Sequence, residues 1–319
     1  MIISASYKTD IPTFYGDWFI NRLRAGYCKT VNPYNRQTLR VSLKPDDVDG
    51  FVFWTKNVGP FLGHLAEIRR RGFAFVVQHT ITGYPHILEQ AVADATKAIE
   101  HVRRLADEFG PRVCVWRYDT IVYSSVTPRD FHIDTFSRLA KGLAGSTDEV
   151  VVSFAHLYHK TLRNMNQVAA EHGFTWSDPP LEWKRSLLAE LAEVAACHQI
   201  RLTVCSQPQF VVPGSREARC VDAVRLSEVS GKAFSAKLRG NRKECGCYEA
   251  RDIGEYDTCP HGCLYCYAVQ NRPLALQRFR QHDPTSEFLF APSADAAEAP
   301  AAPKQVSLPL FDLLDETGG

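Results

Sequence analysis

Three cysteines of this sequence are spaced as the ligands of one metal centre. Cys259, Cys263 and Cys266 stand in the run Thr-Cys-Pro-His-Gly-Cys-Leu-Tyr-Cys-Tyr, which covers residues 258–267. Three thiolates can hold three irons of a cubane cluster and leave the fourth iron open to an exchangeable ligand. Structural zinc sites more often use paired Cys-x2-Cys units that supply four ligands. The spacing indicates a three-thiol metal loop, and a 4Fe-4S cluster is favoured over a zinc knuckle.

The loop resembles the signature of the radical S-adenosylmethionine (SAM) superfamily, Cys-x3-Cys-x-aromatic-Cys, with Tyr265 in the aromatic position. The resemblance implies that Cys259, Cys263 and Cys266 hold a 4Fe-4S cluster whose open iron chelates SAM, with Tyr265 at the SAM site. It also implies that reduction of the cluster cleaves SAM to a 5′-deoxyadenosyl radical, which abstracts hydrogen from a substrate. Such chemistry needs an electron donor, such as a flavodoxin or a ferredoxin.

Two features of the sequence depart from that superfamily. Its cysteine loop normally follows the first strand near the N-terminus, whereas here the loop comes late in the chain. We therefore expect a barrel that is circularly permuted or entered by a C-terminal segment. The Gly-Gly-Glu segment that often binds the SAM amine is absent.

The chain also looks like an uncharacterised bacterial family with three motifs. These are Ile-Ser-Ala-Ser-x-x-Thr-Asp-Ile-Pro at 3–12, Phe-Trp-Thr-Lys-Asn at 53–57, and Cys-Gly-Cys with the cysteine loop at 245–268. A weaker likeness runs to the spore-photoproduct-lyase branch of radical SAM enzymes, which repairs DNA and has a strand-end Thr-Lys. Thr55-Lys56 matches that pair, which implies that Lys56 approaches the SAM carboxylate. A surface lysine is the alternative.

Four further cysteines lie close to the loop in sequence. Seven of the ten cysteines fall within residues 205–266, and the loop accounts for three. The other four are Cys205, Cys220, Cys245 and Cys247. Four is the number of ligands for a fully ligated second cubane or a closed zinc site. We therefore expect a second iron–sulfur cluster or a zinc ion here, with buried free thiols as the alternative.

Upstream of these cysteines, short apolar runs alternate with longer stretches of helical period. This alternation is typical of repeated strand–helix units and a parallel sheet. The predicted strands cover residues 2–6, 50–54, 72–81, 112–118, 149–155 and 200–205. The predicted helices cover residues 16–23, 58–71, 87–109, 128–143 and 182–198. Six such units fit a partial (β/α)6 TIM-like barrel of the α/β class or an open doubly wound sheet.

Polar side chains follow every predicted strand, and the carboxyl ends of strands form the site in parallel α/β folds. This recurrence favours the barrel, although any single residue can also be a cap or a turn former. We predict Tyr118, Tyr158 and Cys205 as candidate radical relays or hydrogen donors. We predict Arg117, Asp119 and His156 as residues that hold polar groups of the substrate or SAM, with a structural role as the alternative for His156.

Composition divides the chain into three regions. Residues 1–205 form the predicted barrel, and residues 206–290 form a cysteine-rich iron–sulfur and SAM segment that completes its site. Residues 291–319 begin as an Ala/Pro-rich linker, which cannot bury enough apolar surface to order itself. The linker leads to Gln-Val-Ser-Leu-Pro-Leu-Phe at 305–311, which resembles the peptides that dock bacterial repair proteins on the replicative sliding clamp. The resemblance implies clamp contacts by Gln305, Leu308, Leu310 and Phe311, and packing back onto the barrel is the alternative.

The net charge of +1 conceals an uneven distribution. Residues 291–319 hold five acids and one lysine, net −4, so residues 1–290 carry +5. The stretch 231–243 holds five cations and no acid. These cations can follow a phosphate backbone, lie solvated at the surface, or offset thiolate-ligated clusters.

Several protein classes are disfavoured by composition. With 45% hydrophobic residues, the chain is neither a disordered polymer nor a polycation that binds nucleic acid by charge alone. Its cysteines are too dilute for a disulfide-stapled scaffold. The first residues lack a signal-peptide pattern, and no apolar run approaches the roughly 18 residues of a membrane span. We therefore expect a reducing cytoplasm and no membrane partner.

These observations predict a radical SAM enzyme that repairs or modifies bases in DNA. The clamp-like peptide, the basic stretch and the likeness to photoproduct lyase together favour DNA as the substrate. One alternative is radical SAM chemistry on RNA or on a small metabolite. Another is a non-catalytic, zinc-stabilised adaptor on nucleic acid.

Overall fold

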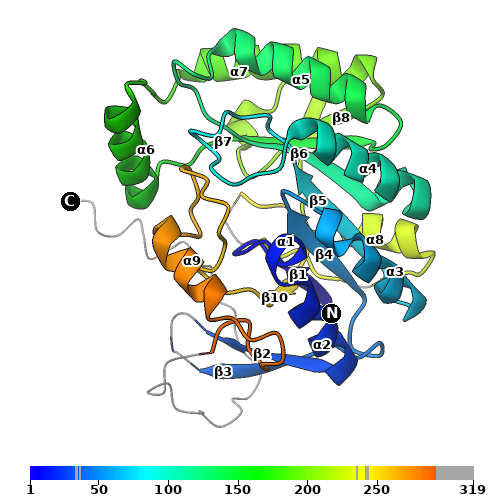
Figure 1. The fold of residues 1–319 in the computed structure, drawn as a ribbon. Coiled ribbons are helices and arrows are strands. Elements are labelled where there is room, and N and C mark those ends of the chain that lie inside the picture. The colour runs from blue at the N-terminus through cyan, green and yellow to red at the C-terminus, as the bar shows by residue number, and fades with distance from the viewer. Residues whose placement is uncertain (33–34, 36, 235, 241–243, 292–319) are drawn as a thin grey trace.

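The computed structural model describes residues 1–291 except 33, 34, 36, 235 and 241–243. The described strands are β1 (Ile2–Ala5), β2 (Tyr27–Val31), β3 (Thr38–Ser42), β4 (Gly50–Thr55), β5 (Phe75–Thr80), β6 (Cys114–Ile121), β7 (Glu149–Phe154), β8 (Arg201–Val204), β9 (Ser215–Glu217) and β10 (Ala250–Asp252). The described α-helices are α1 (Ile11–Phe14), α2 (Gly16–Ala25), α3 (Leu62–Arg70), α4 (Ala95–Phe109), α5 (Arg129–Leu143), α6 (His159–His172), α7 (Leu181–Cys197), α8 (Ala223–Ser230) and α9 (Arg272–Arg280). Figure 1 shows their arrangement.

Eight strands form one parallel sheet in the order β10-β1-β4-β5-β6-β7-β8-β9. The six predicted strands are confirmed as β1, β4, β5, β6, β7 and β8. From β1 to β9 the order follows the chain, whereas a doubly wound sheet reverses its order at a switch point. Within the described part of the chain the edge strands β9 and β10 do not pair. The fold is therefore a mixed α/β fold with an open parallel sheet, and a closed barrel is not found.

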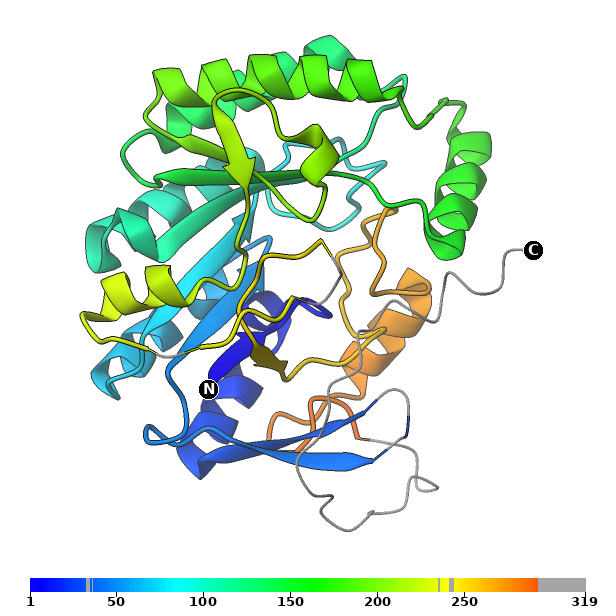
Figure 2. The same cartoon turned by 180° about the vertical axis from the view of Figure 1, so that it is seen from behind.

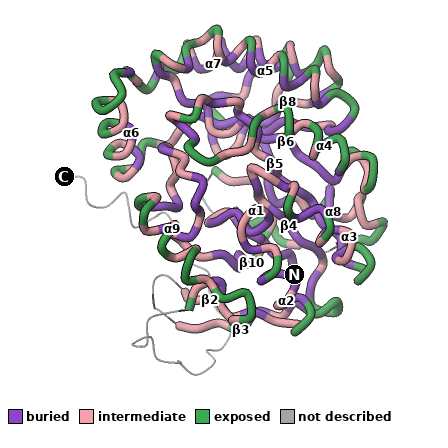
Figure 3. Tube along the Cα trace, in the orientation of Figure 1, coloured by how far each residue is buried: buried purple, intermediate pink, exposed green. Residues whose placement is uncertain are grey.

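Alternate side chains of the strands enter two different apolar layers. Phe51 and Phe53 of β4 pack into the layer that contains the helices, whereas Val52 packs into the layer on the other face. Helices α2, α3, α4, α5 and α7 cover the outer face of the sheet (Figures 1 and 2). Right-handed connections between neighbouring parallel strands place their helices on one side. Figure 3 shows the strands as the buried centre of the molecule.

The inner face of the sheet is covered by late parts of the chain. Side chains from residues 218–226 and from Cys247 pack against Val52, Val76 and Val115. Figure 2 shows the chain leaving α8 and crossing this side of the sheet toward β10. The predicted segment 206–290 therefore contributes β9 and β10, the two edge strands of the sheet.

Strand β10 is anchored by Asp252, although it has only three residues. The Asp252 carboxylate accepts hydrogen bonds from Ser4 Oγ at 2.7 Å, Ser6 Oγ at 2.8 Å and the Tyr7 backbone N–H at 3.0 Å. Because these donors belong to β1 and the turn after it, Asp252 joins the first strand to the last one.

The predicted helix over residues 87–109 is wrong in its first third. Helix α4 begins at Ala95, and Asp94 caps it by accepting a hydrogen bond from the Thr96 backbone N–H at 2.8 Å. An aspartate at the N-cap satisfies a backbone donor that the helix leaves open. The residues before Asp94 instead form a loop that pairs with the cysteine loop near the other end of the chain.

Several other elements were not predicted. The antiparallel hairpin of β2 and β3 is one, and helices α6, α8 and α9 are others. Helix α6 buries only Thr161 and Met165, so it has no broad apolar stripe. Among the described helices, none is both long and apolar enough to span a membrane.

Candidate active site

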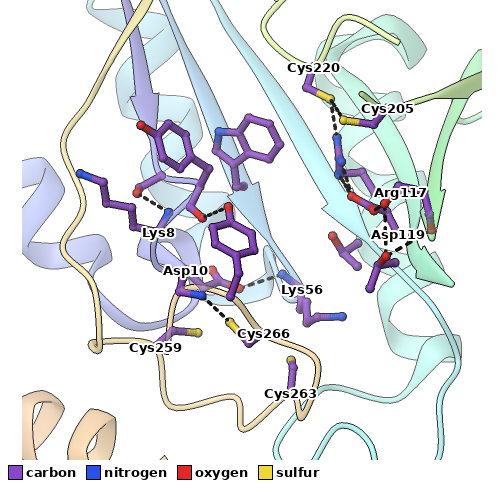
Figure 4. A pocket seen from close by; sticks show the side chains of 18 of the residues that line it. Lys8, Asp10, Lys56, Arg117, Asp119, Cys205, Cys220, Cys259, Cys263 and Cys266 are labelled. Atoms are coloured by element: carbon purple, nitrogen blue, oxygen red, sulfur yellow. Dashed lines mark hydrogen bonds and ion pairs between the residues drawn. The ribbon is translucent and has the colours of Figure 1, made fainter. Parts of the chain in front are cut away.

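The carboxyl ends of the central strands open into one cavity of about 300 Å³. Residues that follow or end β1, β4, β5, β6, β7 and β8 line it, as expected for a parallel sheet. All seven clustered cysteines face the same cavity: Cys205, Cys220, Cys245, Cys247, Cys259, Cys263 and Cys266. We call residues 259–266 the cysteine loop and the other four thiols the four-cysteine wall. Figure 4 shows that Cys205 and Cys220 of the wall lie apart from the three thiols of the loop.

The cysteine loop is held by backbone hydrogen bonds to the segment 88–91. Leu264 N–H donates to Leu88 O at 3.0 Å, and Ala91 N–H donates to His261 O at 2.9 Å. Burial raises the pKa of all three loop thiols above the ordinary value for cysteine. A metal that binds here therefore has to displace protons, as metals do at cysteine sites in general.

Asp10 connects three distant parts of the sequence at the edge of the cavity. Its buried carboxylate accepts hydrogen bonds from the Thr13 backbone N–H at 2.8 Å, the Lys56 backbone N–H at 2.8 Å and His261 Nε2 at 2.7 Å. Burial alone raises the pKa of Asp10, but the contacts with His261 and the two backbone donors outweigh it, so the pKa is lowered. The carboxylate thus ties α1, the end of β4 and the cysteine loop together.

The imidazole ring of His261, in the cysteine loop, contacts one acceptor at each ring nitrogen. Its Nε2 contacts Asp10, and its Nδ1 lies 3.0 Å from the backbone carbonyl of Ala91. A backbone carbonyl and an ionised carboxylate can only accept hydrogen bonds. The two contacts hold the imidazole ring between Asp10 and the segment 88–91.

Lys56 lines the cavity, and its ion-pair partner is Glu89. Lys56 Nζ lies 2.8 Å from Glu89 Oε1, which also accepts hydrogen bonds from Thr82 Oγ1 at 2.7 Å and from the Tyr265 hydroxyl. Burial opposes both charges, but their mutual attraction outweighs it. As a result, the pKa of Lys56 is raised and that of Glu89 is lowered. Lys56 and Tyr265 are therefore fixed by one carboxylate beside Cys263.

Arg117 braces the four-cysteine wall from β6. Its buried guanidinium forms an ion pair with Asp119 and donates hydrogen bonds to Gln78 Oε1 at 3.1 Å and Cys220 Sγ at 3.0 Å. The Ser153 hydroxyl donates to the Asp119 carboxylate. Burial opposes the charge on Asp119, but Arg117 outweighs it and lowers the pKa of the carboxyl. An ionised pair thus lies directly against the thiols.

The wall cysteines contact one another in series. Cys205 Sγ lies 3.4 Å from Cys220 Sγ, and Cys247 interacts with both Cys220 and Cys245. The Val221 backbone N–H donates to Cys247 Sγ at 3.4 Å. The four thiols that were grouped by their number alone are thus brought together by the fold.

The predicted tyrosines fall on opposite faces of the sheet. Tyr158 lines the cavity together with His156, and their ring centroids are 6.0 Å apart. Tyr118 lies between Arg117 and Asp119 on β6, so it points away from them into the helix layer. There its hydroxyl lies 2.9 Å from His132 Nδ1. Tyr118 is not among the residues that line the cavity, and its role as a radical relay stays a prediction.

Two cations that follow the cysteine loop hold its backbone. Arg272 Nε donates to Pro260 O at 3.0 Å, and Arg278 Nη1 donates to Tyr256 O at 2.8 Å. In the basic stretch, Arg239 forms an exposed ion pair with Glu249, while residues 241–243 lie outside the described residues. The predicted clamp peptide at 305–311 also lies outside them.

Three residues of the site were not predicted as functional: Glu89, Asp10 and His261. Asp10 and His261 stand inside the motifs at 3–12 and 245–268, so motif membership was the signal available for them. Glu89 was hidden within the predicted helix over 87–109.

A family model described as "Domain of unknown function (DUF1848)" matches residues 2–268. The chain belongs to this family. The matched range begins with β1 and ends just after the cysteine loop, so it contains all of the residues that line the cavity. Neither a search of curated proteins nor a search of solved structures finds a match.

Proposed function

We propose that this protein is a radical SAM enzyme. The observation that carries the proposal is the position of the cysteine loop. It directly follows β10 at the carboxyl end of a parallel sheet, and its three thiols line a cavity beside the ends of six other strands. The spacing of Cys259, Cys263 and Cys266 is that of the superfamily's cluster loop.

The side chains present are compatible with a 4Fe-4S cluster. Among the described residues, no three His, Cys, Asp or Glu side chains are close enough to hold a single metal ion. A cubane gives each thiolate its own iron, so its ligands surround a volume and do not converge on one atom. Three thiols around an open cavity suit that requirement.

The strand order supports a circularly permuted partial barrel. In the superfamily the cysteine loop follows the first strand. Here β10 lies at the edge beside β1, and the order β10-β1-β4-β5-β6-β7-β8-β9 places the strand that precedes the cysteine loop before the strands that follow in chain order. Such an order is what a circular permutation of the superfamily's fold would give.

When bound, the cluster supplies the electron that cleaves SAM to methionine and a 5′-deoxyadenosyl radical. Lys56 would present its ammonium group to the carboxylate of the methionine moiety, and its ion pair with Glu89 holds that group in place. Tyr265 lies beside Lys56, because its hydroxyl donates to the same Glu89 carboxylate. Across the cavity, Arg117, Asp119, His156 and Tyr158 offer hydrogen bonds to a polar substrate.

We propose a modified or damaged base in DNA as the substrate. The clamp-like peptide at 305–311, the +5 charge of residues 1–290 and the Thr55-Lys56 likeness to photoproduct lyase support it. RNA or a small metabolite is the competing substrate class. An electron donor such as a flavodoxin or ferredoxin could approach from a second cavity of about 430 Å³, because all three loop cysteines line that one too.

Anaerobic reconstitution tests the chemistry. With iron, sulfide, dithionite and SAM, the wild-type protein should form 5′-deoxyadenosine, and Cys266→Ala should not. Cys197→Ala is the matched control because Cys197 is an exposed thiol far from the cavity lining. A protein that contains zinc without iron or sulfide and forms no 5′-deoxyadenosine would instead be the zinc-stabilised adaptor.

A pull-down with the sliding clamp tests the link to DNA. The wild-type chain should be retained on immobilised clamp, and a variant with Gln305→Ala and Phe311→Ala should be lost in the wash. Equal recovery of the two proteins would remove the main support for a DNA substrate while leaving the SAM chemistry unaffected.

A further inference from the structure

We infer that Cys205, Cys220, Cys245 and Cys247 bind a second metal centre, an iron–sulfur cluster or a zinc ion, on a wall of the same cavity. The four thiols come from three segments: the end of β8, the turn before α8 and the Cys-Gly-Cys run. Their contacts in series, from Cys205 to Cys220 to Cys247 to Cys245, make one continuous group of sulfurs.

The surroundings of this group differ from those of cysteines that only fill the core. Cys28 and Cys114 are each buried in the main apolar cluster, where a thiol behaves as a small apolar side chain. The wall thiols also lie in or against an apolar cluster, on the inner face of the sheet, but unlike Cys28 and Cys114 they line an open cavity. They also receive N–H donors, from Arg117 to Cys220 and from Val221 to Cys247. Packing alone requires neither the opening nor the donors.

Charge at the wall suits metal-bound thiolates. Four thiolates around a metal leave net negative charge, and hydrogen bonds to the sulfurs together with nearby charge tune such centres. Arg117 is buried, and its guanidinium reaches Cys220 while the carboxylate of Asp119 binds its other side. Gln78 adds a brace, because its amide donates to the Cys220 backbone carbonyl at 2.8 Å. The wall is therefore a built site with a fixed cation.

Closing the centre requires side-chain rotation. The sulfurs contact one another in pairs, and no three of the described ligand-type side chains gather around one point. Cys205 and Cys245 are the ends of this series of contacts and are only partly buried, so rotation between staggered rotamers can bring their sulfurs inward. With four protein ligands, the centre has no open position for SAM, so its role is structural or electron transfer.

Metal analysis of a chain that lacks the cysteine loop thiols tests this inference. A Cys259→Ala/Cys263→Ala/Cys266→Ala variant, purified without oxygen, should retain either about four irons with sulfide or about one zinc per chain. Adding Cys245→Ala to that variant should remove the metal, whereas adding Cys197→Ala should not. Circular dichroism establishes that each variant is folded.

The outcomes separate this inference from the proposed function. If the folded triple variant holds no metal while the wild-type protein holds iron and cleaves SAM, the second centre is refuted and the proposed function stands. If the triple variant keeps its metal and the wild-type protein forms no 5′-deoxyadenosine, the second centre stands without the proposed function. Retention of the metal after Cys245→Ala would also overturn the assignment, because the metal would then lie elsewhere.

Discussion

The cysteine loop and the four-cysteine wall face one cavity, but the chain builds them differently. The loop takes its thiols from residues 259–266, a single run, and is held from outside by Asp10, Glu89 and the segment 88–91. The wall draws its thiols from three segments between 205 and 247 and is held by one buried cation, Arg117. The loop has its ligand spacing before folding, whereas the wall acquires its spacing only through folding.

The largest loss in the free energy of unfolding is expected from Asp10→Ala, which removes hydrogen bonds that hold the cysteine loop. The change leaves two backbone donors and His261 without their buried acceptor. Breaking such a buried pair costs about 4 kcal/mol. Urea unfolding followed by circular dichroism measures the loss. Asp94→Ala is the matched control. Asp10 is the N-cap of α1 and Asp94 is the N-cap of α4, but Asp94 is exposed, so its replacement should lower the free energy of unfolding by about 1 kcal/mol. Equal losses would mean that Asp10 is only a helix cap.

Glu89→Gln should cost about 3 kcal/mol, because it leaves Lys56 as an unpaired buried charge. The double variant Lys56→Met/Glu89→Gln should recover part of that stability. Because the folded pKa of Glu89 lies below its ordinary value of 4.5, the pair's contribution is present above that pH and is lost as the pH falls through the folded pKa. Because the pKa of Lys56 is raised above 10.5, the contribution is also lost at strongly alkaline pH.

Thermal unfolding at a series of pH values checks the Glu89 prediction. The gap between wild type and Glu89→Gln should be widest near neutral pH and should narrow below about pH 4.5. A gap that stays constant as the solution is acidified would contradict the ion pair as the cause.

Arg117→Lys should affect the wall and leave the loop unchanged. The expected loss in the free energy of unfolding is about 2 kcal/mol. Lysine keeps the charge but cannot reach Asp119, Gln78 and Cys220 in the fork geometry of a guanidinium. In the native, metal-free protein, alkylation of the wall thiols should become faster while that of the loop thiols stays unchanged. Mass spectrometry of the alkylated peptides gives both rates. Parallel acceleration in both groups would mean that the two sites are not independently supported.

The smallest effect is expected from Tyr118→Phe, which touches neither site. It removes the hydrogen bond to His132 in the helix layer and should cost about 1 kcal/mol in urea unfolding. Formation of 5′-deoxyadenosine should be unchanged. Loss of that activity in a stably folded Tyr118→Phe protein would support Tyr118 as a radical relay.

The features that could be predicted from the sequence are those encoded within a short run of residues. The six central strands are runs of buried β-branched and aromatic residues, and the cysteine loop is a spacing within ten residues, so both are legible in the sequence. The side of β6 on which Tyr118 lies was also legible, because neighbours on a strand alternate between faces and Arg117 and Asp119 had been assigned to the site. Applying this alternation places Tyr118 in the helix layer, away from the cavity.

The remaining parts of the site depend on contacts that no local pattern contains. Residues 87–94 follow a helical period, but pairing with 261–264 overrides it and places Glu89 beside Tyr265. Strand β10 has three residues and is recognisable only by its pairing with β1. The wall needed residues 218–226 and Cys247 to pack on the inner face of the sheet, which composition cannot reveal.

The pairing of β1 with β10 also sets an order for biosynthesis. Domains fold as the chain leaves the ribosome from its N-terminal end. The first strand made is therefore held along one side by β4, while its other side waits until residues 250–252 emerge. Asp252 then locks the edge, and the loop thiols follow within the next 14 residues. A translation product that stops before residue 250 thus lacks both the β10 edge of the sheet and the thiols of the loop.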